Sequence, residues 1–245
     1  MRGRLRWVLP PPRARNDPRQ YDDLVLAWQD PRGPFAMLRW LAAHRLTLVP
    51  RAARPGAVLV DLACGGGLLA PGVARLGYRH LGVDISARSL QVAAGRGVSA
   101  VRGDVTRVPF ADSVADVVVA GEILEHVTDP AAVIAEAARL LRPGGVLVVD
   151  TIADTALARL VAVGLAERVR GGPPPGIHDP ALFVDRAALV ATAAGHGIDL
   201  RLHGLRPSAS GYLWWLLGGA DGVRMRRTRL SAVLVAGVGL KRRQS

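Results

Sequence analysis

Residues 57–67 read AVLVDLACGGG, and this stretch decides the fold. An apolar run of strand length leads into Asp61, and a glycine-rich turn follows. Further segments typical of strands then alternate with helical segments: HLGVDIS at 80–86, VSAVRGD at 98–104, ADVVVAG at 115–121, VLVVDT at 146–151, and apolar runs near 199–204 and 230–237. Such alternation is typical of a parallel sheet with crossover helices. We therefore expect a doubly wound, mostly parallel seven-stranded α/β sheet with helices on both faces.

The segments outside these strands predict the domain organisation. Residues 1–19 are rich in proline and arginine, so we expect a mobile basic arm followed by a single domain over 20–245. Within 151–190, a helix near 156–168 and the loop GGPPPGIHDP are expected to form a lid and loop on the substrate side. Helix caps are expected at Ser86, Asp129 and Asp185.

Composition excludes several chemistries. The chain has 245 residues, half of them apolar, and a net charge of +12, yet Lys241 near its end is the only lysine. Phosphate-loop NTPases, pyridoxal-phosphate enzymes and oxidoreductases with a Tyr/Lys pair need a lysine in the core. The single Cys64 cannot form an internal disulfide, and we expect no signal peptide and a cytoplasmic location. No apolar run reaches the roughly 18 residues needed to cross a bilayer.

The basic clusters indicate possible partners. Arginines in residues 1–19 and at Arg224, Arg226, Arg227 and Arg229 could attract an anionic surface, although arginine without lysine is mainly a compositional bias. We expect no nucleic-acid partner, because interleaved aromatic residues and a groove-binding motif are missing.

The residues that leave the first three strands predict a cofactor site. GGGLLA at 65–70 satisfies the dinucleotide fingerprint, so a domain that binds NAD or FAD must be weighed. Asp61 would repel a pyrophosphate, but it suits a ligand with an ammonium group beside its carboxylate, as in S-adenosylmethionine. Asp84 can bond the ribose hydroxyls of either cofactor, and Asp104 can accept the adenine amino group.

Together, DLACGGG, EILEHV at 122–127, LRPGG at 141–145 and GIHD at 176–179 resemble the ubiquinone-biosynthesis O-methyltransferase family. This family belongs to the class I S-adenosylmethionine-dependent methyltransferases, and the resemblance covers about residues 20–205. It implies cofactor contacts at Arg45, Asp61, Ala63, Gly65, Gly67, Asp84, Ile85, Asp104, Val105 and Gly121.

The chain departs from the family pattern at three places. Ala63 replaces the first glycine of the cofactor loop, TIAD at 151–154 replaces T-L-N-R, and Ile177 replaces a threonine. The last two departures lie on the substrate side. The resemblance therefore supports the identity of the cofactor more strongly than the identity of the molecule that accepts the methyl group.

If the methyl acceptor is a phenol, its hydroxyl must lose a proton before it can attack the methyl group, because a phenolic hydroxyl with a pKa of about 10 is mostly protonated at neutral pH. Glu122, His126 and His178 are the candidate catalytic residues. Glu122, Glu125 and His126 fall at i, i+3 and i+4 of a helical turn, where they could share one cation. The resemblance implies Mg²⁺ at these positions, whereas in many metal-free methyltransferases a histidine here caps or packs.

We expect O-methylation of a phenolic, quinone-like or lipid-linked small molecule. Two alternatives stay open: metal-independent methylation of another metabolite at carbon, nitrogen or a sugar hydroxyl, and a catalytically weak cofactor-binding protein at membranes. The apolar residues of 156–168, flanked by Arg159, Arg168 and Arg170, would suit a lid on an anionic bilayer, but also a buried core helix. The oligomeric state is left open.

Overall fold

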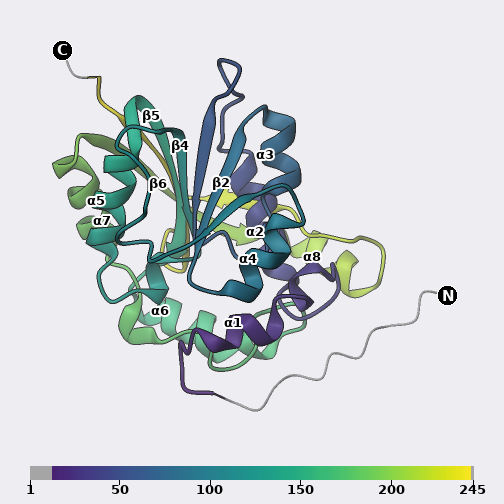
Figure 1. Cartoon of the computed structure of the whole chain (residues 1–245). Helices are drawn as coiled ribbons and strands as arrows, with labels where there is room; N and C mark the ends of the chain where they lie inside the picture. Colours follow the sequence, from purple (N-terminus) through teal and green to yellow (C-terminus); the bar gives the residue numbers. More distant parts are fainter. Residues whose placement is uncertain (1–12, 244–245) are drawn as a thin grey trace.

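A mixed sheet forms the centre of the computed structural model, which describes residues 13–243 (Figure 1). The strands are β1 (Val58–Leu62), β2 (Arg79–Asp84), β3 (Ser99–Arg102), β4 (Ala115–Gly121), β5 (Leu141–Ile152), β6 (Ile198–Pro207), β7 (Met225–Thr228) and β8 (Leu234–Lys241). Their order across the sheet is β3-β2-β1-β4-β5-β8-β6-β7. The five neighbouring strands β3, β2, β1, β4 and β5 pair in parallel. Strand β8 runs antiparallel to both β5 and β6. The doubly wound, mostly parallel fold is confirmed.

The sheet differs from the expectation in strand number and in one boundary. It has eight strands instead of seven, because the short strand β7 pairs with the edge of β6. The predicted strand at 230–237 lies instead at Leu234–Lys241, where Leu234 pairs with Ile152. Pairing across the sheet, which apolar periodicity does not report, determines where this strand begins.

The helices cover both faces of the sheet (Figure 1). Helices α2 (Ala36–Leu46), α3 (Ala70–Leu76) and α4 (Ala87–Ala94) lie on one face, and α5 (Pro130–Leu140) and α7 (Arg186–Gly195) lie on the other. Alternating strand residues serve the two cores: Val117 and Val119 pack in the α2/α3 core, while Val118 and Ala120 pack in the α5/α7 core. The strands are therefore buried on both faces, as in other doubly wound sheets.

The predicted helix caps are confirmed at the start of three helices. Ser86 accepts a hydrogen bond from the Ser89 amide at α4, and Asp129 and Asp185 cap α5 and α7 in the same way. Each cap satisfies backbone donors that the first helical turn leaves free.

The 151–190 segment is helical where expected, but not as one α-helix. A short α6 (Ala156–Ala158) passes into the π-helical η3 (Arg159–Leu165) and the 3₁₀ turn η4 (Ala166–Arg168). The 3₁₀ turn η5 (Pro180–Leu182) follows the proline-rich loop. We call 156–168 the lid segment. Within residues 13–243, no helix combines the length and apolarity that crossing a membrane requires.

The N-terminal segment lies beside the carboxyl ends of the central strands. Part of the expected arm, residues 1–12, falls outside the described residues. Within the described part of the arm, Arg13 donates to Asp23 of α1 (Arg19–Leu24), and the Asn16 amide donates to the Gly176 carbonyl. The 3₁₀ turn η1 (Ala27–Gln29) then leads toward α2. The remaining helical elements are η2 (Leu124–His126) and α8 (Ala209–Leu216).

Candidate active site

One large cavity of about 730 Å³ lies at the carboxyl ends of β1, β2 and β4. Its volume is typical of small-molecule sites (~300–1,000 Å³). Its lining includes the carboxylates of Asp61, Asp84 and Asp104, at or just after the ends of β1, β2 and β3. It also includes His126, His178 and apolar residues of the lid segment. The polar and apolar parts of the lining suit a polar cofactor and an apolar acceptor, respectively.

The glycine-rich turn after β1 is held against the end of β2. The Gly65 amide donates to Asp84 Oδ2 (2.9 Å), and the Ser86 amide donates to Asp84 Oδ1 (2.8 Å). Gly65 has a φ of 50°, and a Cβ there would overlap the Trp28 indole. Each Asp84 oxygen keeps a lone pair for a ligand hydroxyl, because each accepts one of these two amide bonds.

Ala63 departs from the glycine expected in this turn and has a φ of 60°, in the left-handed region. An L-residue with a Cβ is strained there, by about 1–2 kcal/mol. The backbone therefore takes the conformation that a glycine would favour, with alanine in its place. Gly67, at the other end of the turn, has a φ of 71°.

The other cofactor candidates after the first three strands lie where expected. Asp61 is 4% exposed and lies 3.2 Å from His80 Nε2. Ile85 is half exposed at the cavity, and the buried Val105 lines it next to Asp104. The Asp104 Oδ1 atom accepts hydrogen bonds from the amide and the hydroxyl of Thr106, which hold the carboxylate at the rim.

Arg45 reaches the cavity from α2, paired with a partner that the sequence did not indicate. Its guanidinium donates from Nε and Nη2 to the two oxygens of Asp150, both at 2.6 Å. Gly121 allows this approach, because a Cβ there would overlap the guanidinium. Two of the five guanidinium N–H donors are thus used, and the rest stay available to the cavity that Arg45 lines.

Glu122 and Glu125 are buried carboxyls with few partners. Burial and the neighbouring charges of Glu125 and Asp150 raise the pKa of Glu122 well above its ordinary value. Burial also raises the pKa of Glu125 to about 7, although a 2.8 Å hydrogen bond from the Thr151 hydroxyl acts in the opposite direction and lowers it. Glu122 has a φ of 52°, and its Oε1 lacks a hydrogen-bond partner among the described residues.

The two candidate histidines lie together in the cavity wall. The rings of His126 and His178 stack with centroids 5.5 Å apart. Burial lowers the pKa of His126 to about 3, so the ring is neutral at physiological pH. His178 Nδ1 lies 3.8 Å from Glu167 Oε1. Burial opposes ionisation of Glu167, but its pKa is held below the ordinary value by His178, the Gly176 amide and Arg15.

Among the described residues, the structure does not bring together the three side chains expected to bind Mg²⁺. Glu125 is fully buried and bonded to Thr151, and it is not among the described residues that line the cavity. Asn16 and Tyr21 contact the His126 ring. In the described part of the chain, no three His, Cys, Asp or Glu side chains are placed to hold a metal ion. The 3₁₀ turn η2 covers only Leu124–His126, and Glu122, with a φ of 52°, lies outside it, so the three residues do not form the single helical turn that was expected.

Several residues of the site were missed from sequence. Asn16, Tyr21 and Asp150 contact predicted residues more than a hundred positions away, and Glu167 lies beside His178, 11 positions away. Asp150 carried a usable signal, because it lies near the end of the buried strand β5, where it pairs with Gly121. The others lie in segments without a recognisable motif.

Comparisons with known proteins agree with this geometry. A family model described as a methyltransferase domain matches residues 60–149. The ubiquinone biosynthesis O-methyltransferase of Thiobacillus denitrificans is 36% identical over 193 residues, covering 74% of this chain and 81% of the relative. The Hahella chejuensis protein of the same name is 36% identical over 190 residues, covering 74% and 80%.

Solved structures share the fold. A Thermotoga maritima S-adenosylmethionine-dependent methyltransferase, described as a possible histamine N-methyltransferase, has a TM-score of 0.64 at 20% identity and covers 91% of this chain and 98% of its own. The sheet order, the glycine turn and the matched domain define a class I S-adenosylmethionine-dependent methyltransferase. Within that class, the chain belongs to the ubiquinone biosynthesis O-methyltransferase family.

Proposed function

We propose that this methyltransferase methylates a hydroxyl oxygen of a phenolic, quinone-like acceptor. The observation that carries the proposal is a cavity whose lining combines three carboxylates, two histidines and apolar side chains of the lid segment. The names of the relatives support the same acceptor class. Methylation of another metabolite at carbon, nitrogen or a sugar hydroxyl, also without a metal, is the alternative.

The cofactor end of the cavity has groups that fit S-adenosylmethionine. Asp84 would accept the ribose hydroxyls, Asp104 the adenine amino group and Asp61 the ammonium group. Arg45 has guanidinium donors left for the carboxylate, and Ile85 and Val105 would flank the adenine. The backbone of Ala63, Gly65 and Gly67 lets the ligand approach closely, and Gly121 leaves the space that Arg45 occupies.

We assign the general base to His178. Glu167 on the Nδ1 side favours a proton on that atom, so Nε2 is left to accept one. S-adenosylmethionine, when bound, supplies an electrophilic methyl group on a sulfonium. His178 takes the hydroxyl proton, the hydroxyl oxygen forms the new O–C bond, and the C–S electron pair stays on sulfur. His126, whose ring is neutral, then orients the acceptor beside Glu122.

Transfer of labelled methyl to a short-chain catechol tests this function. We expect His178→Ala to lower kcat by roughly 10²–10⁴-fold, Glu167→Gln to lower it less, and His196→Ala, on the exposed end of α7, to leave it unchanged. Because the proposed Mg²⁺ ligands diverge, turnover should survive EDTA. Loss of turnover in EDTA with recovery on adding Mg²⁺ would restore a metal mechanism, and the absence of any methylated catechol would refute the acceptor class.

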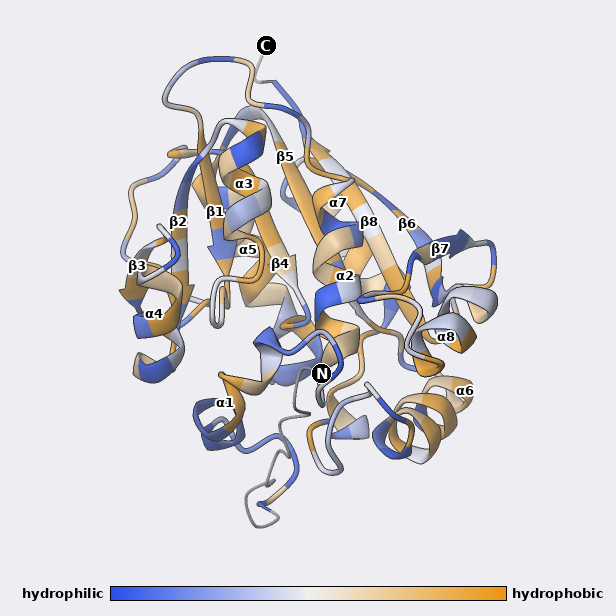
Figure 2. Cartoon of the chain, turned by 90° about the vertical axis from the view of Figure 1, so that its right-hand side faces the viewer, coloured by the Kyte–Doolittle hydropathy of each residue, from blue (hydrophilic) through white to orange (hydrophobic). Residues whose placement is uncertain are grey.

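We further propose peripheral contact with an anionic membrane. Large apolar side chains are exposed on the lid segment and on or just after α8: Leu157, Leu160, Leu165, Leu213, Trp214 and Leu217. The end of the lid segment lies near α8 (Figure 2), where the Tyr212 hydroxyl donates to the carbonyl of Arg170, two residues after the lid segment (2.8 Å). Both elements contribute residues to the cavity lining. A lipid-linked acceptor could enter there directly from a bilayer.

Flotation with liposomes tests this contact. Vesicles containing phosphatidylglycerol should carry the wild-type chain upward, and the double substitution Leu160→Glu, Leu213→Glu should abolish binding. Neither residue lines the cavity, so turnover of a short-chain catechol should persist. Equal flotation of both proteins, or none with the wild type, refutes the contact.

A further inference from the structure

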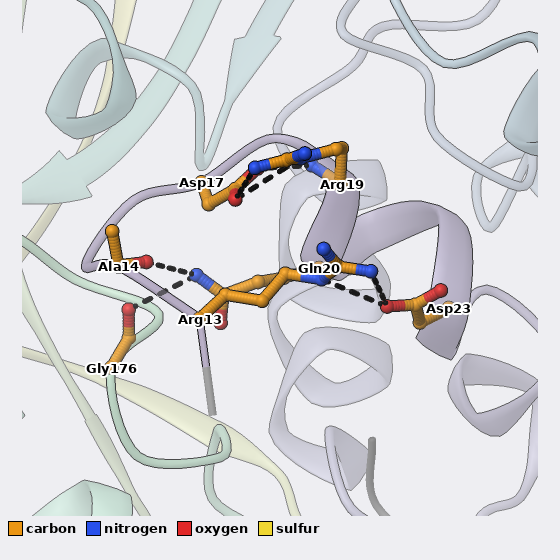
Figure 3. A network of polar contacts seen from close by, with 7 residues as sticks. All are labelled: Arg13, Ala14, Asp17, Arg19, Gln20, Asp23 and Gly176. Carbon is orange, nitrogen blue, oxygen red and sulfur yellow. Dashed lines mark hydrogen bonds and ion pairs between the residues drawn. The ribbon is translucent and has the colours of Figure 1, made fainter. Parts of the chain in front are cut away.

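The N-terminal residues 13–23, which we call the strap, lie across the loop that carries His178. The Gln20 side-chain amide donates to the carbonyls of Ala14 (3.0 Å) and Gly176 (3.2 Å) (Figure 3). Arg13 pairs with Asp23 at 2.8 Å. Arg15 donates to the His178 carbonyl at 2.8 Å. The strap is therefore fastened beside the acceptor part of the cavity, which Asn16, Pro18 and Tyr21 also line.

Asn16 holds His126 through two hydrogen bonds. Its Nδ2 donates to the His126 carbonyl (3.0 Å), and its Oδ1 lies 2.6 Å from His126 Nδ1. A carbonyl oxygen only accepts, so the amide nitrogen must face it, and Oδ1 must face the ring. Because Oδ1 is itself an acceptor, His126 Nδ1 must be the donor. The backbone carbonyl thus determines the tautomer of the ring through the orientation of one amide.

With the proton on Nδ1, His126 Nε2 has a free lone pair. The Tyr21 hydroxyl lies 3.2 Å from each ring nitrogen. An oxygen equidistant from both nitrogens lies off the lone-pair axis of each, so this contact does not saturate Nε2. The ring lines the cavity and stacks on His178, so a hydrogen-bond acceptor stands next to the proposed base.

We infer that Asn16 is a positioning residue that fixes His126 as its Nδ1–H tautomer, so that Nε2 accepts a hydrogen bond from a further hydroxyl of the acceptor, while His178 takes the proton of the hydroxyl to be methylated. The effect of this tautomer on catalysis rests on the proposed function, whereas the hold of Asn16 on His126 does not. An acceptor at this position favours a hydroxyl over a carbonyl, since two acceptors facing each other leave both unpaired. The site should therefore bind the hydroquinone or catechol form in preference to the oxidised quinone.

The backbone of Asn16 provides a matched pair of variants. Its φ of 58° is in the left-handed region, and its amide donates to the Gly176 carbonyl (3.2 Å). Asn16→Gly keeps this conformation and this backbone bond but removes the side-chain amide. Asn16→Asp keeps an acceptor for Nδ1–H and loses the donor to the carbonyl. Arg19→Gln is the control in the strap, because the Arg19 guanidinium pairs with the nearby Asp17 and not with the His126 or His178 segments.

Long-range ¹H–¹⁵N spectra of the full chain, labelled at histidine, report each tautomer directly. The His126→Gln variant assigns the His126 signals. In the wild type, Asn16→Asp and Arg19→Gln we expect a protonated Nδ1 and an unprotonated Nε2, whereas Asn16→Gly should show mixed tautomers. For a catechol acceptor, Asn16→Gly should raise KM by about tenfold, with Asn16→Asp recovering most of the loss.

Two results would overturn the inference: a protonated Nε2 in the wild type, or an Asn16→Gly spectrum and KM identical to those of the wild type. The spectra do not depend on turnover. If no phenolic acceptor is methylated while the tautomers follow the expected series, the role of Asn16 in holding His126 stands and the proposed function fails.

Discussion

Residue-level chemistry explains the most unusual position of the cofactor loop, Ala63. Its φ of 60° costs an L-residue about 1–2 kcal/mol, while glycine loses more entropy on folding, by roughly 0.4–1 kcal/mol. We expect Ala63→Gly to raise the free energy of unfolding by about 0.5–1 kcal/mol, measured by urea denaturation. Ala191→Gly, on the exposed face of α7, should lower it by a similar amount. A loss of stability in both variants would show that the left-handed backbone is not strained.

Glu125 illustrates a buried carboxyl whose ionisation opposes folding. Its pKa rises from about 4.5 to about 7 on burial, so its favourable contribution is complete below pH 4.5 and is lost as the pH rises through 7. Glu125→Gln should therefore match the wild type near pH 4 and exceed its free energy of unfolding by roughly 3 kcal/mol at pH 8. Denaturant unfolding at several pH values measures the difference.

Glu136 is the control with the opposite sign. Hydrogen bonds from Arg139 hold the pKa of Glu136 below its ordinary value, so Glu136→Gln should lose stability at neutral pH and lose less in acid. A pH-independent difference for Glu125→Gln would contradict the raised pKa of that carboxyl.

The sequence predicted some side chains of the site but not the way in which they pair. The carboxylates after β1, β2 and β3 line the cavity as expected, because parallel strands bring their carboxyl ends to one edge. The pairing of Arg45 with Asp150 spans 105 positions, and nothing local to either residue predicts it.

At the scale of elements, the turn between β1 and α3 depends on packing against η1. The Trp28 ring occupies the space that a side chain at Gly65 would need, and the φ of Gly65 is positive. We expect Gly65→Ala to weaken S-adenosylmethionine binding at least tenfold and to lower Tm, as measured by calorimetry. Gly195→Ala, where a Cβ meets no atom within 4 Å, should leave both unchanged. Unaltered affinity in Gly65→Ala would show that the turn can move away from Trp28.

The basic cluster near the C-terminus also has an explanation at this scale. Arg226 and Arg227 lie on β7, the last strand of the sheet, where they pair with Arg206 and Leu205. Charged side chains on an edge strand discourage pairing with other chains. This explains the arginines without requiring a polyanionic partner.

For the whole molecule, ligand binding should distinguish the two cofactor classes weighed from the glycine-rich turn. A ligand at a hundred times its Kd stabilises the folded state by about 2.7 kcal/mol, or roughly 5–10 °C in Tm for a chain of this length. S-adenosylmethionine should produce this shift in a thermal melt, and NAD should not. A shift with NAD alone would favour the dinucleotide reading of GGGLLA.

Lys241 shows how the whole molecule uses its only lysine. Its Nζ donates to the carbonyls of Ala138 (2.8 Å) and Leu141 (2.7 Å), at the junction of α5 and β5. These carbonyls are among those that a helix end leaves without intrahelical donors. The lysine joins the end of β8 to the core, outside the set of described residues that line the cavity.

The sequence by itself determined the parallel sheet, the helix caps, the glycine turn and the methyltransferase family, because apolar periodicity, capping residues and turn residues act over a few neighbouring positions. Only the tertiary structure decided the eighth strand, the divergence of Glu122, Glu125 and His126, and the partners Asp150, Glu167 and Asn16. These depend on backbone conformation, strand pairing and packing within the folded chain, which set the distances between side chains and which no local pattern encodes.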